Sequence, residues 1–230
     1  MEKPAVPNAF DAVAPRYDLM CRLNPGYMGM LGDAARALAP LPLPQPRLLD
    51  LCCGSGLSTQ ALRRAHPGVP IVALDGSPGM LEQARRKPLA PIEFVHGDAQ
   101  APQDSLQGSF GGILMSYGLR NVADPDASLT QLRGLLAPGG LLAIHDYSLA
   151  GPGAERLWTF MCRAVVRPFC AAVSGAPQLF EYLERSVLEF DRRDALAARI
   201  RSAGFDLVRV IAGRLWQRQI VHTFVARRPA

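Results

Sequence analysis

Short apolar runs alternate with amphipathic segments through the middle of the chain. Five of these runs are bounded by turn residues and are expected to form strands, at about 47–52, 70–75, 92–96, 110–116 and 140–146. Helices are expected in the intervals between them. Because strands joined through helices pair in parallel by right-handed crossovers, the pattern predicts an α/β fold with a doubly wound, mostly parallel sheet.

The two ends of the chain extend this pattern. Apolar residues recur at helical spacing on both sides of Asn24-Pro25-Gly26, which predicts two helices before the first strand. A long helical insert follows the fifth strand, and a last helix precedes two more strands near 205–211 and 219–226. We therefore predict one domain over residues 1–230, made of a helical cap (8–40), a core (47–149), a helical insert (150–190) and a C-terminal helix with strands (191–230).

Composition and charge exclude several classes of protein. With 49% hydrophobic and 20% charged residues, the chain is an ordinary globular protein, and its net charge of +5 comes from scattered arginines, so nucleic-acid binding is not indicated. The five cysteines lack C-x-x-C spacing, and no cluster has metal-ligand spacing. We expect no metal and reduced thiols in a cytoplasmic protein. Arg163, Arg167 and Pro168 interrupt the most apolar later stretch, so no membrane span is expected.

The first apolar run ends in the turn Asp50-Leu51-Cys52-Cys53-Gly54-Ser55-Gly56. In α/β proteins a ligand binds at such a strand-to-helix turn, where free backbone N–H groups and the helix dipole meet. A dinucleotide site would require a third glycine or alanine where Thr59 stands. Asp50 would repel a pyrophosphate but suits an ammonium group, and Asp75, which ends the second run, can accept both hydroxyls of a ribose. An amino acid beside a ribose indicates S-adenosylmethionine.

The segment Met115-Ser116-Tyr117-Gly118-Leu119-Arg120-Asn121-Val122 carries a family resemblance. It resembles the Phe-Gly-Leu-Arg-Asn-Val element of the class I S-adenosylmethionine-dependent methyltransferases of the ubiquinone/menaquinone C-methyltransferase group. Phe10 to Tyr17 is similar to their N-terminal signature F-D-x-x-A-P-R-Y-D. Their other motifs are matched by Asp50 to Gly56, Asp75 to Leu81, Gly97-Asp98-Ala99 and Leu136 to Gly140.

The resemblance implies a set of site residues. In the cofactor site, Asp75 holds the ribose, Ser55 the methionine portion and Asp98 with Ala99 the adenine, while Ser116 lies beneath the transferred methyl. The cofactor-binding set is then Asp50, Gly54, Ser55, Gly56, Asp75, Gly76, Met80, Asp98, Ala99 and Ser116. The residues implied in catalysis are Tyr17, Arg120 and Asn121.

Methyl transfer is an in-line displacement, so the enzyme mainly aligns and desolvates its reactants. Arginine stays protonated, so we expect Arg120 to hold a water or a developing oxyanion rather than to act as a base. A structural alternative is an ion pair between Arg120 and Asp124 or Asp126. Asp146, at the end of the fifth strand, is the alternative candidate for the base. Because side chains alternate along a strand, His145 is expected to point to the opposite face of the sheet.

Three segments depart from the family pattern, namely Asn24 to Tyr27, His145 to Ser148 and Trp216 to Thr223. They lie where the substrate is expected, beside an aromatic insert that can roof an apolar pocket. We predict methyl transfer to a lipophilic small molecule, with a quinol or isoprenoid-type ring carbon favoured. O- or N-methylation in secondary metabolism and a cofactor-binding protein without turnover are the alternatives. A homodimer and transient contact with a membrane surface are left open.

Overall fold

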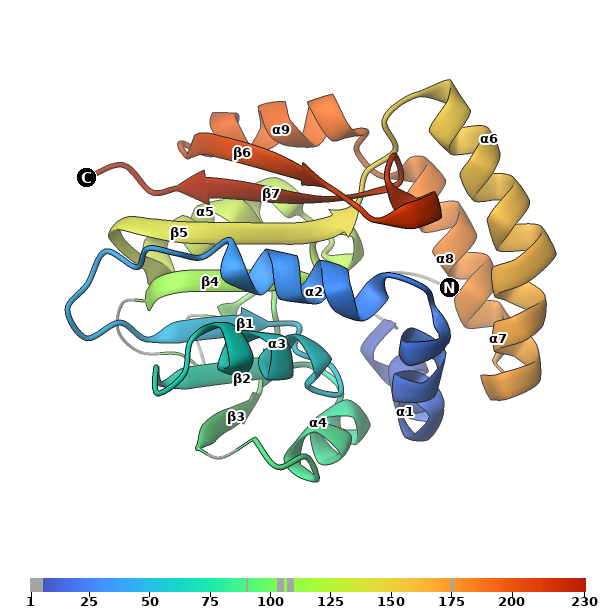
Figure 1. Ribbon diagram of the computed structural model, residues 1–230, viewed down its shortest axis with the longest axis horizontal. Helices are drawn as coiled ribbons and strands as arrows, with labels where there is room; N and C mark the ends of the chain where they lie inside the picture. Colours follow the sequence, from blue (N-terminus) through green and yellow to red (C-terminus); the bar gives the residue numbers. More distant parts are fainter. Residues whose placement is uncertain (1–5, 90, 103–105, 107–109, 175) are drawn as a thin grey trace.

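A seven-stranded sheet forms the centre of the molecule in the computed structural model, which describes residues 6–89, 91–102, 106, 110–174 and 176–230 (Figure 1). Its strands are β1 (Leu48–Leu51), β2 (Ile71–Asp75), β3 (Ile92–His96), β4 (Phe110–Ser116), β5 (Leu136–Tyr147), β6 (Asp206–Ala212) and β7 (Val221–Arg227). The order is β3-β2-β1-β4-β5-β7-β6. The first five strands are parallel, whereas β7 runs antiparallel to both β5 and β6. The predicted doubly wound, mostly parallel sheet is confirmed.

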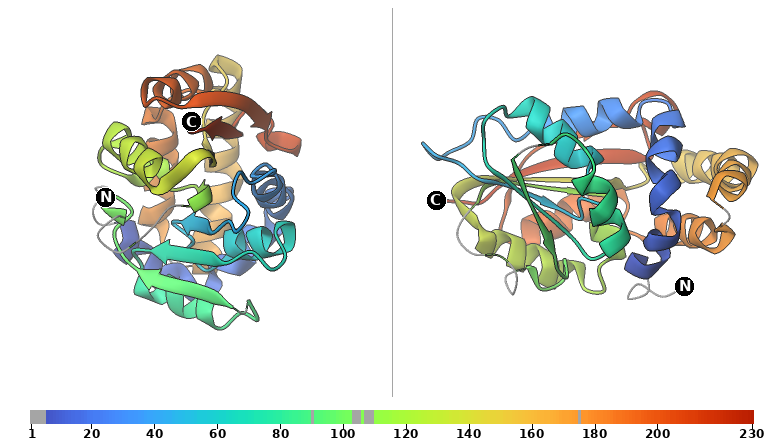
Figure 2. Two further views of the ribbon diagram at one scale, coloured as in Figure 1. Left: turned by 90° about the vertical axis from the view of Figure 1, so that its left-hand side faces the viewer. Right: turned by 90° about the horizontal axis from the view of Figure 1, so that it is seen from below.

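Helices cover both faces of this sheet (Figure 2). One face carries α2 (Tyr27–Arg36), α3 (Leu57–Ala65) and α4 (Pro78–Arg85), and the other carries α5 (Pro125–Leu135) and α9 (Arg193–Ser202). Alternation along β1 sends Leu48 into the first layer and Leu49 with Leu51 into the second. All four β1 residues are therefore buried, as expected of a central parallel strand.

Local signals set the start of two of these helices. Ser77 caps α4 by accepting the Met80 N–H, and proline occupies the first helical position, as the sequence predicts. Asp124 does the same for α5 by accepting the N–H groups of Asp126 and Ala127. These caps fix where the chain leaves each turn at the carboxyl ends of β2 and β4.

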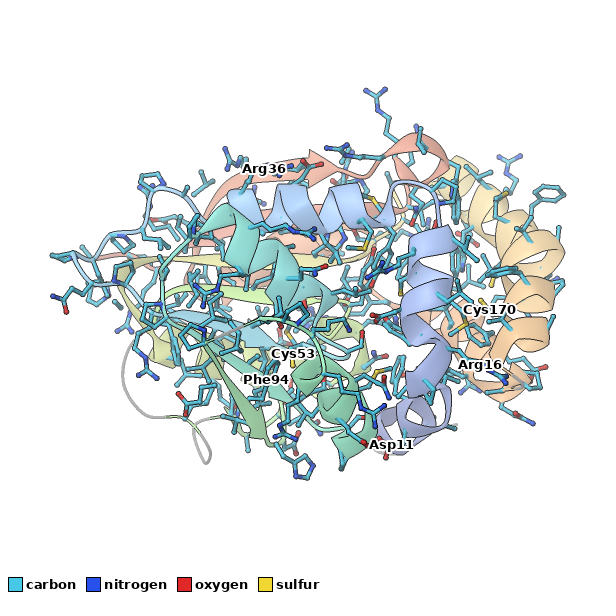
Figure 3. All side chains as sticks on the ribbon, turned by 60° about the horizontal axis from the view of Figure 1, so that its bottom comes forward. Asp11, Arg16, Arg36, Cys53, Phe94 and Cys170 are labelled. Atoms are coloured by element: carbon cyan, nitrogen blue, oxygen red, sulfur yellow. The ribbon has the colours of Figure 1, made fainter. Side chains whose placement is uncertain are left out.

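A further group of helices stands at the carboxyl ends of the parallel strands, at the right of Figure 1. It consists of α1 (Val6–Leu23), α6 (Pro152–Met161), a π-helical turn (Cys162–Val166), α7 (Arg167–Ser174) and α8 (Pro177–Glu189). Arg16 of α1 donates to the Val173 carbonyl of α7 at 2.8 Å, and Cys170 packs in the same interface (Figure 3). The first N-terminal helix and the helical insert thus meet over one edge of the sheet, whereas α2 packs on its face.

Candidate functional site

The turn after β1 depends on left-handed backbone at Cys52, Gly54 and Gly56. A Cβ on Gly56 would lie 3.1 Å from the Ala84 Cβ, so glycine lets α4 pack closely against the turn. The neighbouring turn after β4 packs just as tightly, since a Cβ on Gly118 would lie 2.6 Å from the Cys52 Sγ. The two turns therefore form one rigid floor at the carboxyl ends of β1 and β4.

Asp75 ties this floor to the turn after β2. Its two carboxylate oxygens accept the Gly54 N–H at 2.7 Å and the Ser77 N–H at 2.9 Å. Burial raises the pKa of Asp75, while these two N–H groups act in the opposite direction. Gly76 follows directly in this turn, and the buried Met80 lies one helical turn further along.

Asp50 is fully buried in β1, and only one of its carboxylate oxygens is satisfied. Its Oδ2 accepts the hydroxyls of Ser58 at 2.8 Å and Thr59 at 2.6 Å, whereas its Oδ1 has no hydrogen-bond partner. Burial raises the pKa of Asp50 to about 7, although both hydroxyls oppose the shift. Thr59, which argued against a dinucleotide, thus has a definite role beside the acid.

A small cavity of about 30 Å³ lies above this floor. Its lining comes from α1, α2, the turn after β1, the start of α3 and the end of β4: Tyr17, Tyr27, Leu31, Cys52, Cys53, Gly54, Ser55, Leu57, Ser58 and Ser116. The Ser116 hydroxyl is buried without a hydrogen-bond partner. Asp98 is apart from this lining; it is exposed and accepts the Gln100 N–H at 2.8 Å, with Ala99 beside it.

The carboxylate and hydroxyl oxygens of these turns fit the amino-acid and ribose portions of S-adenosylmethionine. An ammonium group, directly or through a water, would satisfy the Asp50 Oδ1, because a buried acceptor without a donor is unfavourable. The space, however, is far below the roughly 300–1,000 Å³ of a small-molecule pocket. The residues suit the cofactor, while α1 closes the site over them.

Two acids on α1 hold it in this position. Asp18 accepts the Ser55 hydroxyl at 2.5 Å and pairs with the Lys87 ammonium at 2.7 Å. Asp11 accepts the Ser77 hydroxyl at 2.5 Å and the Gly79 N–H at 2.9 Å (Figure 3). The helix is thus fastened to both turns that Asp75 joins. Sequence reasoning missed these acids, although both stand in the N-terminal signature.

Arg120 is buried and pairs with Asp146 rather than with Asp124 or Asp126, so the surface ion pair considered from the sequence is wrong. Its Nε lies 3.7 Å from the Asp146 Oδ1, and its Nη1 donates to Asn121 at 3.0 Å and Ser186 at 3.2 Å. Asp126 pairs with Arg199 instead. The 3.7 Å separation leaves the Nε without a hydrogen-bond acceptor.

Asp146 has backbone partners as well. Its carboxylate accepts the N–H groups of Arg120 at 3.1 Å and Tyr147 at 2.8 Å. Burial raises its pKa, and the Arg120 charge with these donors opposes that shift. The opposite orientation expected for His145 is confirmed, since its ring nitrogens lie near Tyr117 and Thr223.

All five tyrosines of the chain gather in this region, four of which sequence reasoning did not select. Tyr117 stacks on Tyr27 at 5.4 Å and contacts Tyr147 at 5.3 Å, and the Tyr182 hydroxyl donates to Asn121 at 3.1 Å. Tyr17 shares hydrogen bonds with Tyr27 and the Cys21 thiol. The sequence offers one signal for three of the four, because Tyr27, Tyr117 and Tyr147 stand in segments that were compared with the family motifs.

Among the described residues no group of three or more metal-ligating side chains comes together. In the same part of the chain, no helix combines the length and apolar character that crossing a membrane requires. All five cysteines carry free thiols.

The sequence matches a known family along most of its length. A sequence model described as the ubiE/COQ5 methyltransferase family matches residues 1–212. A demethylmenaquinone methyltransferase of Clavibacter sepedonicus is 35% identical over 89% of this chain and 84% of its own. A 2-phytyl-1,4-naphtoquinone methyltransferase of Thermosynechococcus vestitus is 36% identical over 87% of this chain and 90% of its own.

Solved structures share the fold at much lower identity. Magnesium protoporphyrin IX methyltransferase of Synechocystis, solved with bound S-adenosylhomocysteine, aligns with a TM-score of 0.61 and 16% identity over 91% of this chain and 85% of its own. The [4+2]-cyclase SpnF aligns with a TM-score of 0.71 and 15% identity over 100% of this chain and 98% of its own. The fold alone is therefore compatible with more than one activity.

The α1 contacts predict the effect of Asp11→Ala. Hydrogen bonds to a charged group contribute about 1.5–3 kcal/mol each, so opening of α1 should become at least tenfold more frequent. Hydrogen exchange followed by mass spectrometry should show faster exchange in α1 and an unchanged rate in β4. Asp33→Ala, which removes exposed ion pairs with Arg36 and Arg214, is the control. Equal α1 protection in all three proteins would contradict the fastening role.

Proposed function

The chain belongs to the ubiE/COQ5 methyltransferase family, and on this premise we propose that it moves a methyl group from S-adenosylmethionine to a ring carbon of a lipophilic quinol. The observation that carries this proposal is the group of tyrosines that extends from the cofactor turn, which Tyr17 and Tyr27 line, through Tyr117 to Tyr147, whose ring lies 5.4 Å from the buried Arg120 guanidinium. Flat aromatic walls suit a planar ring, and the names of the relatives support a naphthoquinone-type acceptor.

The cofactor is assigned to the turns after β1 and β2. Asp50 and Ser116 offer buried oxygens without hydrogen-bond partners. Asp75 would hold the ribose, and Ser55 would hold the amino-acid portion. Gly54, where a Cβ would meet nothing within 4 Å, and Gly56 would bring the backbone of the turn to the ligand. Asp98 with Ala99 would hold the adenine, and Gly76 and Met80 are the remaining proposed contacts. When bound, the cofactor supplies an electrophilic methyl group on a sulfonium.

The residues of the chain prepare the acceptor for that methyl. Stacked rings exclude water from the acceptor carbon and hold its plane in one orientation. The Arg120 Nε has no hydrogen-bond acceptor, so the guanidinium can stabilise an oxyanion as the ring hydroxyl loses its proton. Asn121 orients the Arg120 Nη1, and Tyr17 closes the site from α1.

Asp146 is better suited to orient Arg120 than to remove a proton. Its carboxylate already accepts two backbone N–H groups and lies 3.7 Å from the Arg120 Nε. We therefore assign Asp146 the role of positioning Arg120. The proton of the ring hydroxyl leaves through a water held by that arginine.

Two other functions remain as alternatives, namely O- or N-methylation and cofactor binding without turnover. O- or N-methylation would use the same cofactor site. The cyclase among the structural neighbours shows that this fold also serves other chemistry. The deciding experiment incubates the protein with methyl-labelled cofactor and a reduced naphthoquinol. A label on a ring carbon supports the proposal, a methyl ether indicates O-methylation, and binding without transfer indicates a protein that does not turn over.

Asp50 gives a prediction on pH. Because burial places its pKa near 7, a proton must leave before the carboxylate can bind an ammonium group. Cofactor affinity should therefore fall as pH drops below 7, approaching tenfold per unit. Calorimetry between pH 5.5 and 8 measures this dependence. Asp50→Asn should bind more weakly with a flatter profile, and an equally steep profile in the variant would remove Asp50 from the assignment.

Arg120 gives a prediction on turnover. Loss of a donor that acts only as charge develops lowers turnover by about a hundred- to a thousandfold, with little change in cofactor affinity. Arg120→Ala should behave in this way, and Arg120→Lys should not rescue it because lysine lacks the planar fork. Arg199→Ala, which removes another paired arginine on α9, is the control. Near-normal turnover in both Arg120 variants would refute the assigned role.

The outer face of α6 and the π-helical turn supports transient contact with an anionic membrane, where such a quinol would lie. Leu157, Phe160 and Val165 are exposed there, with Phe160 64% exposed, beside Arg156 and Arg163. Apolar side chains flanked by arginines are typical of helices that lie on a bilayer surface.

Phe160→Ser tests this contact. The variant should sediment with phosphatidylglycerol vesicles several-fold less than the wild type. Val208→Ser, which changes another exposed apolar residue on β6, is the control and should sediment like the wild type. Equal sedimentation of all three proteins would refute membrane contact. Light scattering that shows a dimer lost in Phe160→Ser would instead identify this face as the contact between two copies.

A further inference from the structure

Tyr117 occupies a strained position at the end of β4. Its φ of 57° lies in the left-handed region, which a bulky aromatic residue rarely adopts. The Tyr117 N–H donates to the His145 carbonyl at 2.7 Å, and the Asn121 amide donates to the Tyr117 carbonyl at 3.1 Å. Such backbone strain persists only where the surroundings enforce it, and it is characteristic of functional sites.

The surroundings fix the Tyr117 ring on three sides. Tyr27 stacks on it at 5.4 Å with an interplanar angle of 8°, and Tyr147 contacts it at 5.3 Å. The His145 ring meets it edge-on at 4.9 Å and 76°. Tyr27 in turn lines the cavity above the cofactor turn, so the stack joins the cofactor half of the site to the aromatic half.

A chain of hydrogen bonds fixes the Tyr117 hydroxyl. Its oxygen lies 3.1 Å from the His145 Nε2, and the His145 Nδ1 lies 2.8 Å from the Thr223 hydroxyl. His145 and Thr223 are direct neighbours in the β5–β7 pairing, so the geometry is set by the sheet. Burial lowers the pKa of His145 to about 3, which keeps the imidazole neutral at working pH.

The acidities of the phenol and the imidazole decide which group donates in each of these hydrogen bonds. A phenol is a stronger acid than a neutral imidazole N–H, and the bare imidazole nitrogen is a stronger base than a phenol oxygen. The Tyr117 hydroxyl therefore donates to Nε2, and Nδ1–H donates to Thr223. With its single proton engaged in this way, the Tyr117 oxygen has only lone pairs left for another partner.

We propose that Tyr117, fixed by His145 and Thr223, is a specificity-determining residue that accepts a hydrogen bond from a ring hydroxyl of the methyl acceptor. The site then favours the hydroxyl-bearing, reduced ring over its carbonyl-bearing, oxidised form, which presents two acceptors and no donor. This inference rests on the proposed function. It also suits the reaction, because only the electron-rich reduced ring attacks a methyl group.

The partition of roles across the site agrees with this proposal. Arg120 is a donor and suits the hydroxyl that becomes an oxyanion, whereas Tyr117 suits a hydroxyl that keeps its proton. Tyr147 lies between them, with its ring 5.3 Å from that of Tyr117 and 5.4 Å from the Arg120 guanidinium.

The test compares the binding of two probes, 1,4-naphthohydroquinone kept reduced with dithionite and its dimethyl ether, in the presence of S-adenosylhomocysteine. The wild type should bind the hydroquinone at least tenfold more tightly than the ether. Tyr117→Phe keeps the ring and removes only the hydroxyl, so the ratio of the two dissociation constants should fall about tenfold. The affinity for S-adenosylhomocysteine should stay unchanged.

Histidine variants separate this role from a structural one. His145→Phe should lower the ratio as Tyr117→Phe does, whereas His145→Gln should retain it, because the amide oxygen can accept the tyrosine proton. His222→Gln is the control, since this second buried histidine contacts Ser148 at 2.9 Å instead. An unchanged ratio in Tyr117→Phe would overturn the proposal even if the wild type methylates the hydroquinone. A wild type that neither binds nor methylates the hydroquinone would overturn the proposed function itself.

Discussion

The arrangement of the site depends on one buried carboxylate. Asp75 accepts a backbone N–H from each of two turns, after β1 and before α4, and so fixes their separation. The N-terminal helix then attaches to these same turns, through Asp18 at one and Asp11 at the other. A change in the separation of the turns would therefore alter both the cofactor cradle and the cover above it.

The two halves of the site use opposite chemistry. The cofactor half presents carboxylates and hydroxyls, among them the unsatisfied oxygens of Asp50 and Ser116, and suits a cationic ligand. The acceptor half presents aromatic rings and one buried guanidinium, and suits a flat ring that gains negative charge. Because β1 and β4 are adjacent in the sheet, the two halves meet without any long loop.

The sheet and the cofactor turn could be predicted from the sequence, because strand periodicity and glycine turns are local signals. Strand positions agree to within a few residues apart from the early start of β5. The fastening by Asp11 and the pairing of Arg120 with Asp146 could not be predicted, because both depend on contacts across 26 or more residues. The convergence of the tyrosines likewise depends on how α2, α8 and the turns pack.

The position of β7 has a consequence for the order of assembly. This strand follows β6 in the chain but lies inside the sheet, where it supplies Thr223 to His145. During synthesis the cofactor turns are complete long before residue 221 emerges, whereas the edge of β5 stays unpaired until then. An exposed edge of that kind invites pairing with other chains. The nascent protein thus completes the turns proposed to bind its cofactor first and closes the edge of β5 last.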